Sequence, residues 1–301
     1  MFSETTPVMP RVDHFKRERS PGVTRIPANA ASRVRDRVNH TLLSRDWGAM
    51  RACAGDELVF DDRRRWSLLS GGVDLWIKSC ETIQTASGLA ISDELIGTVG
   101  DRIELRRRVL TGTGPDGGDF ESELILLTEA TPDGRLVASI NFDVEARAEA
   151  FADAQDRFLA GEAAAVGGQV PLLRAMHAFA RRDWELLRGC FVSGAGIADR
   201  RATADGGELD RDHALESWRA FADRVPDVHA ESPRILMWNA HGRVAVIRLY
   251  AATPGGEPFD DVVIGVFWTE ADRIRRCELY DPDDADTALT GFAERCSPGD
   301  P

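Results

Sequence analysis

The chain repeats part of its own sequence about 137 residues further on. Arg45-Asp46-Trp47 recurs as Arg182-Asp183-Trp184, and Asp62-Arg63-Arg64 recurs as Asp199-Arg200-Arg201. Further matches follow in the same order, with an offset that drifts by a few residues: Arg37 with Arg174, His40 with His177, Arg51 with Arg188, Cys53 with Cys190, Phe120 with Phe259, Thr128-Glu129-Ala130 with Thr269-Glu270-Ala271 and Phe142-Asp143 with Tyr280-Asp281. So many ordered matches predict a tandem duplication.

The duplication suggests how the 301 residues are divided. A unit of roughly 130 residues can bury about two-thirds of its unfolded surface, which is enough for a core of its own. Residues 161–168 are mostly small and read as a linker. We therefore expect a leader at 1–27, a first domain at 28–160, the linker at 161–168, a second domain at 169–296 and a tail at 297–301.

Each half predicts the same series of elements. A first helix begins near Ala31, and its counterpart carries Leu172. Asp46 and Asp183 stand where an N-cap would start a short second helix. Third helices are expected at 74–86 and 212–224, and strands at 91–99, 102–111, 120–129, 135–143, 228–238, 243–252, 259–269 and 272–280. This order predicts an α+β fold with helices on one face of an antiparallel sheet.

Composition excludes several classes of function. Arginine and lysine number 37 against 50 acidic residues, a formal charge of −13, which argues against a nucleic-acid partner. Lys16 and Lys78 are the only lysines and neither follows a glycine, so the chain has no phosphate-binding loop. Gly112–Gly117 satisfies the dinucleotide pattern but lies between two predicted strands, where a hairpin turn explains it.

Other features bear on compartment and metals. The five cysteines form no C-x-x-C pair, and no apolar stretch is long enough for a signal peptide or a membrane span. We therefore expect a cytoplasmic protein that needs no cofactor, no metal and no membrane.

The repeated motifs resemble one protein group. The helix that ends in Arg-Asp-Trp, the strand that runs into Asp-Arg-Arg, the segment Glu278–Asp283 and the closing helix through Phe292 together look like the SnoaL-like members of the nuclear transport factor 2-like (NTF2-like) superfamily, present twice over 28–296. They are similar, more narrowly, to paired modules at the C-terminal end of actinobacterial nucleotide-cyclase-like and ATPase-like regulatory proteins. The leader segment Val12–Phe15 resembles the junction that precedes those modules. The resemblance implies two cone-shaped barrels, each with a curved sheet and a pocket at its open end.

The Asp-Arg-Arg segments are the first candidates for chemistry. Residues two apart on a strand share a face, so each Asp should lie beside the second Arg. In family enzymes a pocket carboxylate is the general base, and relatives that hydrolyse epoxides use an Asp-Arg-Asp group, which this sequence matches only in part. The candidate groups are Asp62, Arg64 and Asp143 in the first unit and Asp199, Arg201 and Asp281 in the second. The competing interpretation is an ion pair at the sheet rim, and its recurrence in both units favours that interpretation.

The two tyrosines of the chain, Tyr250 and Tyr280, lie in the second half. A phenol beside an acid could polarise a carbonyl group, as in ketosteroid isomerases. We expect Tyr250 to pair with Asp199 or Asp261, which makes the second unit the better candidate for catalysis. The alternative is an aromatic side chain half-buried in a sheet.

The sequence thus leaves three hypotheses open. The leading one is a non-catalytic module that binds a small apolar or amphipathic ligand, or mediates assembly, in a regulatory setting. The alternative is a SnoaL-like enzyme, such as a polyketide cyclase or an isomerase, in which a pocket Asp is the general base for isomerisation, cyclisation or water addition. The third is a structural unit that forms an internal pseudo-dimer or a homodimer. Fold alone does not choose among them.

Overall fold

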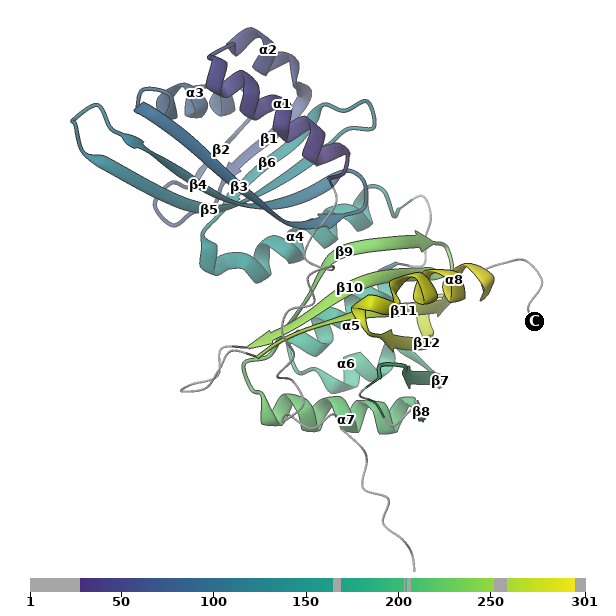
Figure 1. Cartoon of the computed structure of the whole chain (residues 1–301). Helices are drawn as coiled ribbons and strands as arrows, with labels where there is room; N and C mark the ends of the chain where they lie inside the picture. Colours follow the sequence, from purple (N-terminus) through teal and green to yellow (C-terminus); the bar gives the residue numbers. More distant parts are fainter. Residues whose placement is uncertain (1–27, 165–168, 203, 205–206, 252–258, 296–301) are drawn as a thin grey trace, which may run out of the picture. The chain divides into compact units, whose positions relative to one another are not determined.

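The computed structural model describes residues 28–164, 169–202, 204, 207–251 and 259–295. They fall into two compact units, the first unit (28–162) and the second unit (163–295), which we describe separately (Figure 1). The predicted leader and tail, residues 165–168 of the predicted linker and the predicted turn at 253–256 lie outside the described residues.

The first unit contains every helix and strand expected for it and three further elements. The strand ends differ from the predicted ones by at most four residues, and β2, the 3₁₀ turn η2 and α4 are additional. The elements are α1 (Ala30–Ser44), α2 (Trp47–Ala52), β1 (Ala54–Asp62), β2 (Leu69–Gly71), α3 (Val73–Ile83), β3 (Ser87–Val99), β4 (Ile103–Thr113), β5 (Asp119–Ala130), β6 (Leu136–Phe142), η2 (Val144–Ala146) and α4 (Arg147–Ala160).

The second unit has the same order of elements. They are α5 (Val170–Ala180), α6 (Trp184–Gly189), β7 (Phe191–Asp199), β8 (Glu208–Asp210), α7 (Arg211–Arg224), β9 (His229–Asn239), β10 (Gly242–Ala251), β11 (Phe259–Glu270), β12 (Arg273–Tyr280), the 3₁₀ turn η3 (Pro282–Asp284) and α8 (Ala285–Arg295).

The repeated Arg-Asp-Trp motif forms a tight corner between two helices. Arg45 and Arg182 both adopt a left-handed backbone, with φ of 57° and 58°, which ends the first helix of each unit. The next residue caps the following helix: Asp46 accepts a hydrogen bond from the Ala49 N–H at 2.9 Å, and Asp183 makes the equivalent bond. The predicted caps are confirmed.

The sheet of each unit is mixed, so the prediction of an antiparallel sheet is wrong at one pair per unit. The strand order is β2-β1-β6-β5-β4-β3 in the first unit and β9-β10-β11-β12-β7-β8 in the second. β1 runs parallel to β6, with Asp62 opposite Asn141, and β7 runs parallel to β12. Alternation of apolar and polar residues does not reveal the direction of a strand. A long stretch of chain joins β1 to β6, and parallel pairing requires a connection of this kind.

Helices cover both faces of each sheet, which corrects the prediction of helices on one face (Figure 1). In the first unit, Arg35 of α1 donates a hydrogen bond to Thr128, and Arg157 of α4 donates one to the next residue, Glu129. Adjacent residues of a strand point to opposite faces, so α1 and α4 lie on opposite faces of the sheet. In the second unit, Phe267 packs with α5–α7 and Trp268 packs against α8. We call the side of α1–α3 and α5–α7 the inner face, and the side of α4 and α8 the outer face. The four consecutive buried apolar residues 124–127 of β5 need this cover on both faces.

Candidate functional site

Asp62, which is buried, forms an ion pair with the half-buried Arg64 at the end of β1. The Arg64 Nε and Nη2 atoms donate to the two carboxylate oxygens of Asp62 at 2.8 and 2.6 Å. Burial by itself would raise the pKa of Asp62, but the hydrogen bonds and charge of Arg64 outweigh it, and the pKa is lowered. A carboxylate with a lowered pKa is a poor proton acceptor, so Asp62 is suited to hold Arg64.

The second unit adds another carboxylate to the same pair. Arg201 donates to Asp199 at 2.9 and 2.6 Å and, through Nη1, to Asp261 at 3.1 Å. The pKa of Asp261 is raised, first by burial and also by the charge of Asp199, against the opposing effect of Arg201. In the first unit Ser122 takes the corresponding place, since Arg64 Nη1 donates to its hydroxyl at 3.3 Å. The two units therefore differ in the second residue that the arginine contacts, which is Ser122 in the first unit and Asp261 in the second.

The structure gives Asp143 and Asp281 a different place from the one predicted. The Asp143 carboxylate accepts a hydrogen bond from the backbone N–H of Arg65 at 3.0 Å, and Asp281 accepts one from the backbone of Ala202 at 2.8 Å. Each thereby fixes the loop that follows β1 or β7. The charge of Asp281 reaches Arg201, but the direct contacts of that guanidinium are with the carboxylates of Asp199 and Asp261.

Neither tyrosine lies beside this group, so the predicted pairing of Tyr250 with Asp199 or Asp261 is wrong. Tyr250 is opposite Asp260 in the sheet, which puts both on the outer face, whereas Asp261 is opposite Leu249 on the inner face. A difference of one residue in register moves a side chain to the other face. Tyr280 donates to Glu278 at 2.6 Å; burial, together with this bond, raises its pKa to about 12.

A hollow of about 420 Å³ opens on the inner face of the first unit, between the end of α3 and strands β4 and β5. Its volume falls within the range of small-molecule sites. Most of its wall is apolar, and no Asp or Glu is among the described residues that form it. They are Arg64, Thr82, Ile83, Thr85, Ala86, Leu110, Gly114, Pro115, Phe120 and Ser122.

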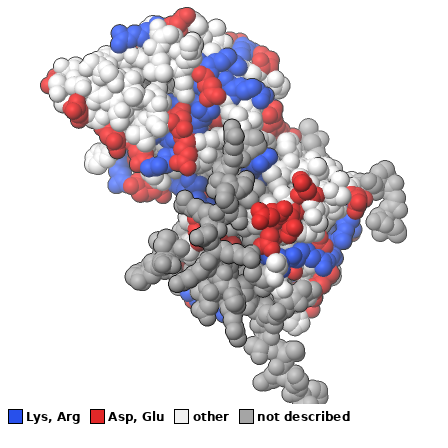
Figure 2. All heavy atoms as spheres, in the orientation of Figure 1, with Lys and Arg blue, Asp and Glu red and all other residues white. Residues whose placement is uncertain are grey.

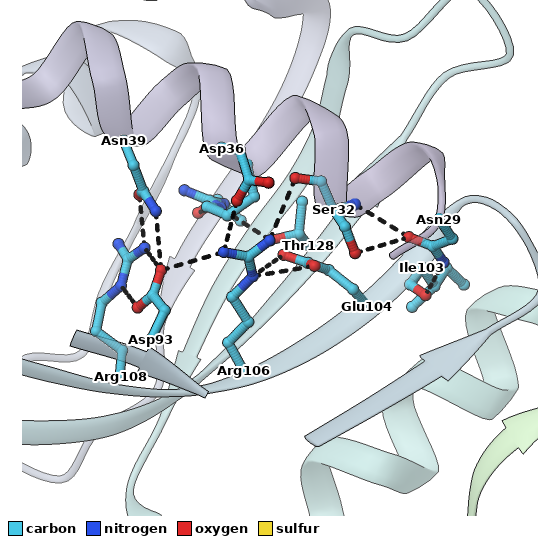
Figure 3. Close-up of polar contacts among 12 residues, drawn as sticks. Asn29, Ser32, Asp36, Asn39, Asp93, Ile103, Glu104, Arg106, Arg108 and Thr128 are labelled. Carbon is cyan, nitrogen blue, oxygen red and sulfur yellow. Dashed lines mark hydrogen bonds and ion pairs between the residues drawn. The ribbon is translucent and has the colours of Figure 1, made fainter. Parts of the chain in front are cut away.

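Further along the same face, under α1, lies a buried network of charged side chains (Figure 3). Asp93 accepts two hydrogen bonds from Arg108, both at 2.7 Å, and one from Asn39 at 2.8 Å. Arg106 pairs with Glu104 at 2.9 Å and with Asp36 at 2.8 Å. The side chains of Asp93, Glu104, Arg106 and Arg108 are each at most 10% exposed. On β4 the network ends at Arg108, and the next inner-face residue, Leu110, already lines the hollow.

The network also includes a buried arginine of α1, Arg35. Arg35 Nε donates to Thr128 at 2.9 Å and Nη2 donates to Ser139 at 3.0 Å. Its burial, with the charge of Arg108, lowers the pKa of Arg35 to about 10. The pKa of Asp93 is lowered, because the hydrogen bonds and charge of Arg108 outweigh its burial. The network thus fills the inner face under α1, and the hollow is limited to the part of the strands beyond it.

The sequence patterns did not predict this network. Glu104, Arg106 and Arg108 alternate along one strand, a pattern that normally marks a face exposed to water. The internal repeat offered one signal, because Leu172 stands where the first half has Arg35. An arginine with an apolar counterpart in an equivalent helix indicates a local polar environment in one unit only.

Three further features of the described residues concern metal ligands, membrane helices and surface charge. Over the part of the chain that the structure describes, no group of three or more His, Cys, Asp or Glu residues is arranged to hold a metal ion. In that same part, none of the helices is both long enough and apolar enough to cross a membrane. Figure 2 shows basic and acidic side chains interspersed over the visible described surface, without a large area of one sign.

Comparison with known proteins gives structural likenesses only. No protein-family model and no curated protein matches the sequence. Three solved structures that resemble part of it are a Mycobacterium tuberculosis protein in complex with estradiol-17beta-hemisuccinate (13% identity, 38% of this chain and 92% of that chain, TM-score 0.34), the epoxide hydrolase/cyclase-like enzyme SalBIII (11%, 37% and 88%, TM-score 0.33) and an NTF2-like protein of unknown function from Exiguobacterium (15%, 37% and 95%, TM-score 0.31). One of the three, the Exiguobacterium protein, is named as NTF2-like. At these TM-scores the likenesses decide neither the fold nor the chemistry of this chain, which rest on its own topology and contacts.

Proposed function

We propose that the chain is a non-catalytic protein that binds a small, largely apolar molecule in the hollow of the first unit. The observation that carries the proposal is the hollow itself, with its apolar walls and an arginine that Asp62 already neutralises. Ligand sites combine apolar walls with a few polar groups that fix orientation. The lowered pKa of Asp62 argues against proton transfer there.

The polar groups of the hollow favour a neutral ligand. The Ser122 hydroxyl accepts from Arg64, which leaves its own proton free to donate to a ligand oxygen. The Thr82 and Thr85 hydroxyls donate to backbone carbonyl groups at 2.9 and 2.7 Å. A carboxylate ligand would gain little from Arg64, because the Asp62 carboxylate already takes two of its hydrogen bonds. We therefore expect a ketone, an alcohol or an ether on an apolar body.

The substitution Ala86→Phe tests this site. Ala86 lines the hollow and is 6% exposed, so a phenyl group there would fill the space that a ligand needs. We expect methyl naphthyl ketone to raise the melting temperature of the wild-type protein, and naphthoate of similar size to raise it less. Ala86→Phe should abolish both shifts in a thermal-denaturation assay.

The matched control is Ala148→Phe, which places the same side chain on an exposed position of α4 and should keep the ligand-induced shift. Two results would count against the site. One is a shift that survives in Ala86→Phe; the other is a complete absence of shift across apolar ketones, alcohols and acids.

A specific observation favours a second candidate function, proton transfer at Asp199, Arg201 and Asp261. Asp261 has a raised pKa, which suits a general acid, and the arginine that it contacts also holds Asp199, the candidate base. In the hydrolysis of an epoxide, the water oxygen would bond to a ring carbon as the bond from that carbon to the ring oxygen breaks. Asp199 would take a proton from the water, and Asp261 would give one to the ring oxygen. The first unit, with Ser122, lacks the acid.

Asp261→Asn separates this function from simple binding. If the second unit hydrolyses small apolar epoxides, the variant should lose at least a hundredfold in kcat, because an amide cannot deliver the proton. Asp260→Asn is the matched control, since Asp260 is the neighbouring residue but faces outward and bonds Arg248 at 2.8 Å. No detectable epoxide hydrolysis by the wild-type protein, or equal rates in the two variants, would remove this candidate.

A further inference from the structure

The loop between β1 and β2 holds two large apolar side chains out in solvent. Trp66 is 91% exposed and Leu68 is 75% exposed, the highest values among the exposed large apolar residues that the structure describes. Leu69, at the start of β2, is 42% exposed. Tryptophan is usually largely buried, and exposed apolar groups that lie together mark surfaces that bind something.

Hydrogen bonds on both sides of Trp66 hold this loop in place. The Arg65 N–H donates to the Asp143 carboxylate at 3.0 Å, and the Ser67 N–H donates to the Arg64 carbonyl at 2.9 Å. Arg64 is itself fixed by Asp62. The backbone on both sides of Trp66 is therefore fixed, which lowers the entropy cost of binding a partner there.

A second hollow, of about 440 Å³, lies beside Trp66 and is acidic. Its walls are Trp66 and Val144 together with four charged residues, Arg65, Glu123, Asp143 and Glu145. Asp143 pairs with Arg65 at 3.5 Å and Glu123 pairs with Arg107. Glu145 is exposed and has no ion pair among the described residues. An aromatic face next to an uncompensated carboxylate suits an ammonium or guanidinium group.

We propose that Trp66, Leu68 and this acidic hollow form a docking site for a partner-protein segment that carries arginine or lysine beside apolar residues. The cationic group would stack on the Trp66 ring and reach Glu145, while apolar neighbours cover Leu68. The sign of the hollow makes it unfavourable for anionic lipid or nucleic acid. Tryptophan dominates the energy of many protein interfaces, which fits its place at the centre of this surface.

Titration calorimetry with the full chain at low salt tests the proposal. The probes are an amidated peptide of alternating leucine and arginine and its counterpart with glutamate in place of arginine. We expect the basic peptide to bind and the acidic peptide not to bind. Trp66→Ala should weaken binding at least tenfold, and Glu145→Gln should weaken it about threefold and make it less sensitive to salt.

Matched variants keep the test specific. Leu43→Ala removes another exposed apolar side chain, on α1, and Glu57→Gln neutralises an exposed carboxylate on β1; both should bind as the wild type does. Equal binding of the two peptides, or wild-type affinity in Trp66→Ala, overturns the proposal. It is also overturned if the surface binds a second copy of the chain, seen as a concentration-dependent dimer that Trp66→Ala abolishes, or if it binds anionic vesicles in place of the basic peptide.

Discussion

Asp93→Asn will lower the free energy of unfolding of the first unit by about 3–5 kcal/mol at neutral pH, the cost of breaking a buried ion pair from one side. Asp93 accepts two hydrogen bonds from Arg108, and its Oδ2 atom also lies 3.4 Å from Nη1 of Arg106. An amide keeps the shape of the side chain but leaves the two guanidinium groups without this counter-charge. Urea denaturation measures the loss, and amide exchange in β3 and β4 assigns it to the first unit.

The effect of Asp93→Asn should depend on pH in a defined direction. The pKa of Asp93 is lowered in the folded protein, so its contribution is fully present above the unfolded value of roughly 3.9 and is lost as pH falls through the folded value. The difference between variant and wild type should therefore shrink below about pH 4. Asp74→Asn is the control, because the Asp74 side chain is 87% exposed and its ion pair with Arg51 should contribute under about 1 kcal/mol. Similar losses in the two variants would contradict a structural role for the network.

The sequence predicted the elements that local chemistry decides. Asp46 and Asp183 cap helices because a short carboxylate can accept from free N–H groups, and that property needs no knowledge of distant residues. Strand positions followed from alternation in the same way. The parallel pairing of β1 with β6 was missed because it depends on how the chain returns across the sheet.

The candidate site was predictable only in part, for the same reason. Asp62 and Arg64 are two residues apart on one strand, so their contact could be expected from sequence alone. The contact between Arg201 and Asp261 joins residues 60 positions apart and depends on the register of strands that the sequence does not fix. Tyr250 was misplaced by the same register, because a shift of one residue decides which face a side chain occupies.

Arg201→Gln should lower the free energy of unfolding of the second unit by about 3 kcal/mol at neutral pH. The guanidinium is 10% exposed and is shared by Asp199 and Asp261, so its removal leaves two partly buried carboxylates facing each other. The equivalent Arg64→Gln should cost less, because the partners there are one carboxylate and the neutral Ser122.

The pH dependence of the Arg201→Gln variant follows from Asp261. Its pKa is already raised by burial, and loss of Arg201 removes the main influence that lowers it. A carboxyl group with a raised pKa in the folded state binds its proton more tightly than in the unfolded state, so stability falls as pH rises from the unfolded value of roughly 3.9 through the folded one. Urea denaturation between pH 4 and 8 should therefore show the variant losing stability relative to the wild type across that range. Arg51→Gln, which removes an exposed guanidinium, should follow the wild type throughout. A pH-independent deficit in Arg201→Gln would mean that the arginine stabilises the unit by packing, and that Asp199 and Asp261 do not share its charge.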